Sequence, residues 1–248
     1  MTPRSGVTLA LILAIAIPAI GGEMPPTPPT TTYQFGLLRK GPAWTAKRTP
    51  ATDSIQAGHM ANIGRMWEEG VLVAAGPILD GGDLRGIFIF RADSVAQVRA
   101  LAARDPAIQS GRLVLDLHTW LAPPGIGEPY RRLAKQPGFR DSMITLQLAL
   151  LRLGPKAGTT AAPALERLRT AHVRGMLAAL ASGELATAGP FVEDGDLRGV
   201  MIYRADSTTS RRRAHEDPVV RAGEFRVEMH PWFSAYGNMP GDTLAATR

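Results

Sequence analysis

Apolar residues along the chain fall into short runs typical of strands, separated by longer segments with helical spacing. The first half contains four strand-like runs, at residues 33–38, 71–75, 86–90 and 113–120. Turn residues follow these runs, including Gly41-Pro42 after the first and the Asp-Gly-Gly-Asp segment at 80–83. The pattern therefore predicts a four-stranded sheet in which the second and third strands form a hairpin.

Two segments between these strands have the spacing of amphipathic helices. In residues 55–69 one face is formed by Ile55, His59, Ile63 and Met66. Asp53 or Ser54 is the expected N-cap of this helix. A second helix is expected at 95–103, and it ends at Asp105 because the residue before a proline disfavours the helical conformation. The resulting order, β-α-β-β-α-β, is that of a ferredoxin-like unit.

The same pattern occurs twice. The stretch 75–94, AGPILDGGDLRGIFIFRADS, returns at 188–207 as AGPFVEDGDLRGVMIYRADS, with 13 of 20 positions identical. The offset of 113 residues pairs His59 with His172, and it falls to 112 after the second helix. A repeat of this length indicates two units of one fold. Helices on one face of each sheet leave the other face bare. We therefore predict an α+β fold, in which two ferredoxin-like βαββαβ repeats pack sheet to sheet as a pseudo-dimeric α+β barrel.

The segments outside the repeats have other compositions. Residues 1–22 have a basic Arg4, an apolar run of 14 residues and small residues at a cleavage position, as in a secretory signal. That run is short for a membrane span, although an uncleaved anchor is the alternative. The expected organisation is a signal peptide at 1–22, a linker at 23–32, repeats at 33–120 and 143–233, a linker at 121–142 and a mobile tail at 234–248. We expect an exported protein, periplasmic or secreted, with no stable membrane span after signal removal.

Charge and cysteine content narrow the possible functions. The formal net charge is +6, but the basic residues are scattered, and the run 211–213 fits a solvated helix face. Nucleic-acid binding is therefore not expected. The chain has no cysteine, which excludes disulfides, Cys-ligated zinc and a cysteine nucleophile. No Gly-rich phosphate loop is present, and the His and acid spacing is diagnostic of no metal, so we expect no cofactor and no metal.

An ordered set of residues in each half resembles the YCII-related (YciI-like) domain family. In the first half the set is His59, Ala75-Gly76-Pro77, Ser94, Asp105-Pro106, Gly111 and Trp120. In the second half it is His172, Ala188-Gly189-Pro190, Ser207, Asp217-Pro218, Gly223 and Trp232. The resemblance implies a dimeric α+β barrel, with a His–Asp pair in a cleft as the catalytic element and, in some members, substituted aromatics as substrates. Tandem fusion and export depart from the family pattern.

The first candidate residues are the two helix histidines. His59 and His172 could exchange protons near neutral pH, with Asp105 and Asp217 or the hairpin acids orienting them. The alternative is that both histidines are packed core residues and that both aspartates only cap the chain before a proline. The recurrence of the pair in both repeats favours a function.

Further candidates lie in the hairpins and at the strand ends. Asp83 and Asp196 sit in turns, and Arg85 and Arg198 follow them, as ion pairs or as a binding site for an anionic substrate. Strand alternation directs Leu113, Leu115 and Leu117 toward the helices, and Phe225, Val227 and Met229 in the second half. The opposite face then carries the acids Asp116 and Glu228 together with His118, Trp120, His230 and Trp232. These could bind substrate between the sheets, or merely form a polar strand end.

Two functions remain from the sequence. One is an exported enzyme that uses His/Asp acid–base chemistry on a cyclic or aromatic-derived small molecule. The other is a non-catalytic small-molecule-binding or structural tandem-barrel module. In either case a small molecule is the expected partner, and the internal pseudo-dimer could be monomeric. Sites in both repeats, in one or in neither are all compatible with a duplication.

Overall fold

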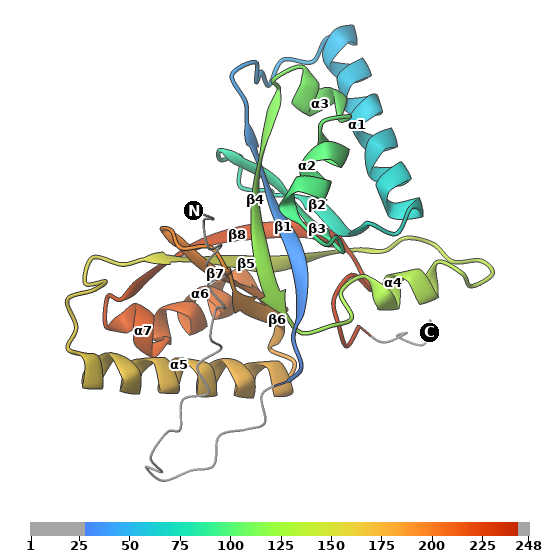
Figure 1. The fold of residues 1–248 in the computed structure, drawn as a ribbon. Helices are drawn as coiled ribbons and strands as arrows, with labels where there is room; N and C mark the ends of the chain where they lie inside the picture. Colours follow the sequence, from blue (N-terminus) through green and yellow to red (C-terminus); the bar gives the residue numbers. More distant parts are fainter. Residues whose placement is uncertain (1–27, 243–248) are drawn as a thin grey trace, which may run out of the picture.

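The computed structural model describes residues 28–242, so the expected signal peptide and the last six residues of the expected tail lie outside the described part. Figure 1 shows two similar βαββαβ units that cross each other. The first contains β1 (Thr31–Lys40), α1 (Pro50–Glu68), β2 (Leu72–Pro77), β3 (Leu84–Phe90), α2 (Val95–Ala102), α3 (Pro106–Gln109) and β4 (Leu113–Ala122). The second contains β5 (Met143–Leu153), α5 (Ala162–Ala181), β6 (Leu185–Pro190), β7 (Leu197–Tyr203), α6 (Ser207–Glu216), α7 (Pro218–Arg221) and β8 (Phe225–Ala235).

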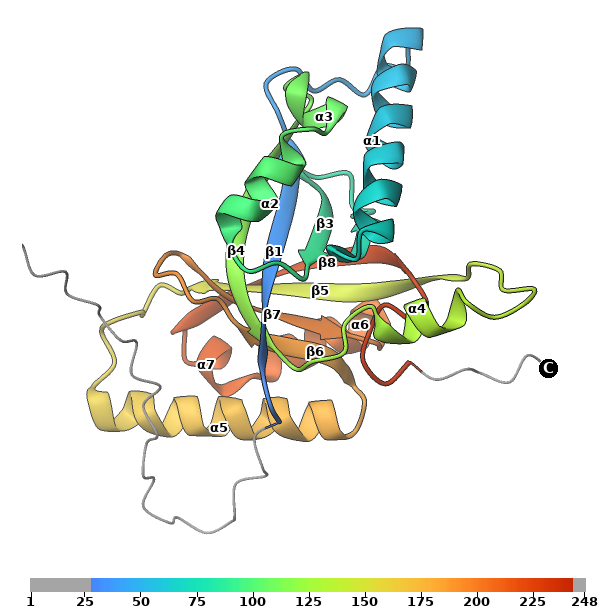
Figure 2. The same cartoon turned by 45° about the vertical axis from the view of Figure 1, so that its right-hand side comes forward.

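Each repeat forms one antiparallel four-stranded sheet. The strand orders are β2-β3-β1-β4 and β6-β7-β5-β8, which is the ferredoxin-like topology in both cases. The registers correspond between the repeats: Phe35 faces His118, and Leu148 faces His230. In Figures 1 and 2 the helices of each repeat lie on the outer side of its sheet, away from the other repeat. The predicted order of elements is confirmed.

The two bare sheet faces pack against each other, as predicted. One apolar core joins residues of both sheets, including the fully buried Phe35, Trp120, Leu148 and Trp232. A smaller core lies between each sheet and its own helices. Leu113, Leu115 and Leu117 belong to the first of these, and Phe225, Val227 and Met229 to the second. The predicted directions of the β4 and β8 side chains are therefore confirmed.

The edges of the two sheets also meet. The end of β8 bridges the segment after β2 at Ile78, where the Leu79 amide donates to the Pro231 carbonyl oxygen over 2.9 Å. The equivalent junction joins β4 to the segment after β6. A Cβ on Gly76 would lie 2.0 Å from the Phe233 carbonyl oxygen, so only glycine permits this approach. The repeated Ala-Gly-Pro segment thus closes the barrel.

The cap of the first helix differs from the expectation. Helix α1 begins at Pro50 and is capped by Thr49, which forms a capping box with Thr52; the expected caps Asp53 and Ser54 lie inside the first turns. Proline suits the first helical position because its missing N–H would have no partner there. Ser94 caps α2, and in α6 the cap is Asp206, the residue before Ser207, the counterpart of Ser94.

The expected linker and tail contain ordered structure that the sequence pattern does not predict. Helix α4 (Glu128–Leu133) lies in the linker, and residues 234–242 pack beside it. The Tyr130 amide donates to the Gly237 carbonyl oxygen over 2.8 Å, and Met239 is fully buried. Residues 234–242 are therefore ordered, in contrast to the expected mobile tail. The sequence pattern does not predict this order, because backbone hydrogen bonds need no apolar periodicity. No helix among residues 28–242 is long and apolar enough to cross a membrane.

Candidate active site in the second repeat

A histidine–aspartate pair forms in each repeat. His59 Nδ1 on α1 donates to Asp105 Oδ2 over 2.8 Å, and His172 Nδ1 on α5 donates to Asp217 Oδ2 over 2.7 Å. The other oxygen of each aspartate caps the short helix that follows it. Each aspartate therefore caps a short helix and also orients a histidine, so the capping role and the orienting role apply to the same residue.

The pairing fixes the proton on each imidazole ring. A carboxylate can only accept a hydrogen bond, so Nδ1 carries the proton and Nε2 is left to gain or lose one. Burial raises the pKa of Asp105, but the hydrogen bond and charge interaction with His59, together with hydrogen bonds from the Ala107 amide and Asn62, hold this pKa below its usual value. The carboxylate of Asp105 is thus stable beside His59.

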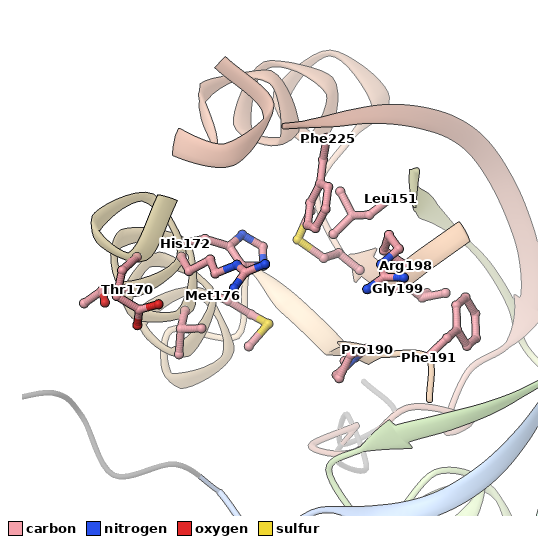
Figure 3. Close-up of a pocket in the computed structure, with 15 residues that line it drawn as sticks. Leu151, Thr170, His172, Met176, Pro190, Phe191, Arg198, Gly199 and Phe225 are labelled. Carbon is pink, nitrogen blue, oxygen red and sulfur yellow. The ribbon is translucent and has the colours of Figure 1, made fainter. Parts of the chain in front are cut away.

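A cavity of about 430 Å³ adjoins the His172 pair. Figure 3 shows His172 and Met176 projecting from α5 on one side, and Arg198 and Phe225 from the sheet on the other. The apolar residues that line it are Leu151, Val173, Met176, Pro190, Phe191, Val200, Met201 and Phe225. Small-molecule sites have volumes of about 300–1,000 Å³ and a mostly apolar lining with few polar groups. The cavity has the size and character of such a site.

Larger side chains fill the corresponding space in the first repeat. Phe88 stands where the second repeat has Met201, and its ring stacks on the ring of His59 with centroids 6.0 Å apart. Asn62 donates to Asp105 Oδ2 over 3.1 Å, whereas its counterpart in the second repeat is Gly175. His59 is only 7% exposed. The first pair is therefore enclosed, and the second faces a cavity.

The hairpin residues have different roles from one another. Asp83 pairs with Arg39 at 3.1 Å and Asp196 pairs with Arg152 at 2.8 Å, so neither hairpin aspartate orients a helix histidine. The guanidinium of Arg85 lies over the Trp44 ring, 4.9 Å from its centroid. Arg198 lines the cavity instead. Both aspartates form ion pairs, but with arginines of the neighbouring strands and not with the expected Arg85 and Arg198.

The strand-end histidines are held by the junctions between the repeats. His230 Nδ1 lies 2.6 Å from Asp80 Oδ2, and Nε2 lies 3.0 Å from Glu228 Oε1. At the other junction Glu193, the counterpart of Asp80, accepts from the Thr119 amide over 2.8 Å. That bond cannot form with Pro231, the counterpart of Thr119, because proline has no N–H.

His118 and the two tryptophans complete the set of predicted site residues. His118 packs on Phe191 with ring centroids 4.8 Å apart, and burial lowers its pKa despite the nearby carboxylates of Glu193 and Asp116. Trp120 and Trp232 are fully buried in the core between the sheets. They therefore hold the barrel together, and they do not line the cavity.

The hydrophobic pattern does not distinguish the residues that open the cavity. The differences are Met201 for Phe88, which stacks on His59, and Ala157 for Trp44, whose ring covers Arg85 in the first repeat. Both exchange one apolar residue for another and are therefore invisible to a hydrophobic pattern. Comparing side-chain volumes between the aligned repeats would have found them. Among residues 28–242 no group of three His, Asp or Glu side chains could hold a metal ion.

The fold and the paired histidines define a tandem ferredoxin-like barrel with one open His–Asp site. The family model of the YCII-related domain matches residues 40–117, which lie in the first repeat. No curated protein matches the sequence.

Solved structures resemble the whole tandem arrangement. A protein described as a putative chlorite dismutase is 12% identical, with a TM-score of 0.51 over 81% of this chain and 94% of that one. A variant of chlorite dismutase from Candidatus Nitrospira defluvii is also 12% identical, with a TM-score of 0.50 over 81% and 90%. A heme-binding protein from Thermus thermophilus is 15% identical, with a TM-score of 0.47 over 84% and 92%. At these identities the first two likenesses show a shared fold.

Proposed function

We propose that the chain is a small-molecule enzyme with a single acid–base site, built on His172 and Asp217 in the second repeat. The observation that carries this proposal is the cavity of about 430 Å³ lined by a histidine whose Nδ1 is held 2.7 Å from a carboxylate. His59, enclosed under Phe88, has a structural role. The substrate is a cyclic or aromatic-derived molecule, which the apolar lining of the cavity accommodates.

His172 exchanges the proton in this scheme. Its Nε2 accepts a proton from the bound molecule and returns it at another position or to the leaving group. Asp217 keeps the ring in the Nδ1–H tautomer and stabilises the imidazolium that forms, as a carboxylate does in a catalytic triad.

Proton exchange in deuterated water tests the proposal directly. Cyclic acids, phenols and lactones are incubated with the full-length chain, and loss of C–H signals is followed by NMR. We expect His172→Gln to slow exchange by about 10²- to 10⁴-fold, the usual contribution of a positioned acid–base group. His59→Gln, checked for folding by circular dichroism, should exchange at the wild-type rate. Equal rates in all three proteins would refute the proposal.

The alternative is a binding module without catalysis. It would show ligand-induced shifts around the cavity and no His172-dependent exchange. Hemin is included in the panel, because a histidine whose Nδ1 donates to a carboxylate is also a good metal ligand. A bound-heme absorbance band that disappears in His172→Gln would replace the acid–base proposal.

We also propose that the second repeat is a further YCII-related domain and that the protein is exported. The shared His–Asp pair and the Ala-Gly-Pro junction support the first statement, and the composition of residues 1–22 supports the second. N-terminal sequencing of the protein from its native cells tests export. A start near residue 23 is expected, whereas an intact N-terminus in the cytoplasmic fraction would refute it.

A further inference from the structure

The polar groups in the second-repeat cavity are unequally distributed. Two arginines, Arg169 and Arg198, and one acid, Glu166, line it together with His172. Arg169 and Glu166 lie one turn apart on α5, on the helix side of the cavity. Arg198 stands on β7 across from α5, among apolar side chains (Figure 3). Arg198 is therefore the cation on the sheet side of the space beside His172, and its acidic partner Asp194 does not line the cavity.

The present contacts of Arg198 leave most of its donors available. Its two recorded hydrogen bonds, to Asp194 over 3.2 Å and to the Gly195 carbonyl oxygen over 3.4 Å, both use Nη1. The Asp194 side chain is fully exposed, and exposed ion pairs of this kind contribute little stability. A guanidinium has five donors in a planar fork that fits a carboxylate through two bonds. A ligand could therefore use Arg198 without breaking a strong interaction.

In the first repeat an aromatic ring covers Arg85, the counterpart of Arg198. Arg85 lies over the Trp44 ring, and its Nε is buried without a hydrogen-bond partner. The counterpart of Trp44 is Ala157, so the second repeat has no ring to cover Arg198. The substitution that removes the ring thus uncovers the cation in the repeat that also has the cavity.

We propose that the ligand is a small monoanionic carboxylate with an apolar body, whose carboxylate is bound by Arg198. This inference rests on the proposed function for the position of the reacting end. The carboxylate meets the guanidinium, the apolar body contacts Met201 and Phe225, and the far end of the molecule reaches His172. On the sheet side a single guanidinium, that of Arg198, faces the cavity, and it matches one negative charge, which favours a carboxylate over a phosphate dianion.

Paired probes test this inference. Benzoate and benzamide have nearly the same shape and differ in charge, and their affinities are measured by calorimetry for the full-length chain. We expect benzoate to bind at least about tenfold more tightly, since a hydrogen bond to a charged group is usually worth a tenfold to hundredfold change. Arg198→Gln should remove this preference, and the matched control Arg85→Gln should retain it. Equal affinities for the two probes, or an equal loss in Arg85→Gln, would overturn the inference.

The acid–base proposal and the carboxylate inference can be refuted independently of each other. His172→Gln should still prefer benzoate, because the anion is held on the opposite side of the cavity. If Arg198-dependent preference is found while His172→Gln leaves proton exchange unchanged, the ligand class stands and the acid–base function fails. If exchange depends on His172 but benzoate and benzamide bind alike, the enzyme proposal stands and the carboxylate inference is refuted.

Discussion

Removing the carboxylate of Asp105 should destabilise the protein much more than removing that of Asp217. Asp105 accepts hydrogen bonds from His59, Asn62 and the Ala107 amide, at 2.8, 3.1 and 2.9 Å. Its side chain is 1% exposed, against 11% for Asp217, which accepts from two donors beside open space. The enclosed pair therefore has more donors to satisfy and less access to water.

The magnitude follows from the unsatisfied donors. Breaking a buried charged pair costs about 3–5 kcal/mol, so we expect that loss for Asp105→Ala. In Asp217→Ala water can reach the donors that are left, so the cost should be about 1.5–3 kcal/mol, that of a lost hydrogen bond to a charged group. At about 2–4 °C per kcal/mol for a chain of this size, the melting temperature should fall by about 6–20 °C in Asp105→Ala and about 3–12 °C in Asp217→Ala.

Thermal unfolding followed by circular dichroism measures both variants, and pH provides a second test. Because the folded pKa of Asp105 lies below its unfolded value, its contribution is complete above the unfolded pKa of about 3.9 and is lost as pH falls through the folded pKa. The gap between wild type and Asp105→Ala should therefore narrow below about pH 4. A loss in Asp217→Ala as large as in Asp105→Ala would refute the distinction between an enclosed and an open pair.

Three further predictions concern the cavity and the junctions between the repeats. Met201→Phe should fill the cavity and abolish small-molecule binding in calorimetry while the melting temperature stays within a few degrees of wild type; unchanged binding would contradict the assignment of the site. Gly76→Ala places a Cβ 2.0 Å from a carbonyl oxygen and should cost at least about 3 kcal/mol in chemical denaturation, whereas Gly64→Ala, with no atom within 4 Å, should be neutral or stabilising by about 0.5–1 kcal/mol. Burial raises the pKa of Asp80, but the hydrogen bonds from His230 and the Gly82 amide lower it by more, so the net pKa lies below its usual value. Asp80→Asn should therefore be less stable than wild type at pH 6, with the difference lost below about pH 4; a constant difference would argue against the ion pair.

Much of the architecture could be predicted from the sequence. The internal repeat set the register, and strand alternation correctly placed Leu115 toward the helices and Trp120 between the sheets. The pairing of His59 with Asp105 was also predicted, through a family resemblance. Helix α4 and the packed segment 234–242 were missed, because their order depends on contacts with each other and not on a local pattern.

The location of the open site could not be predicted from residue types. Both repeats have the same His, Asp and Arg at matched positions, so chemistry alone gives two equal candidates. The difference lies in packing: Phe88 and Trp44 fill one copy, while Met201 and Ala157 leave space in the other. A pattern that records only apolar against polar treats these residues as equivalent, and only their volumes distinguish the copies.

The shared core explains how the two copies can differ in this way. Each sheet covers the bare face of the other, and Trp120 and Trp232 from the two repeats lie in one core between them. Neither repeat could be removed without exposing that core. The helix-side spaces, in contrast, belong to each repeat alone, in two separate clusters. Filling the first space with Phe88 therefore stabilises one half without altering the second, where the cavity beside His172 remains open for a ligand.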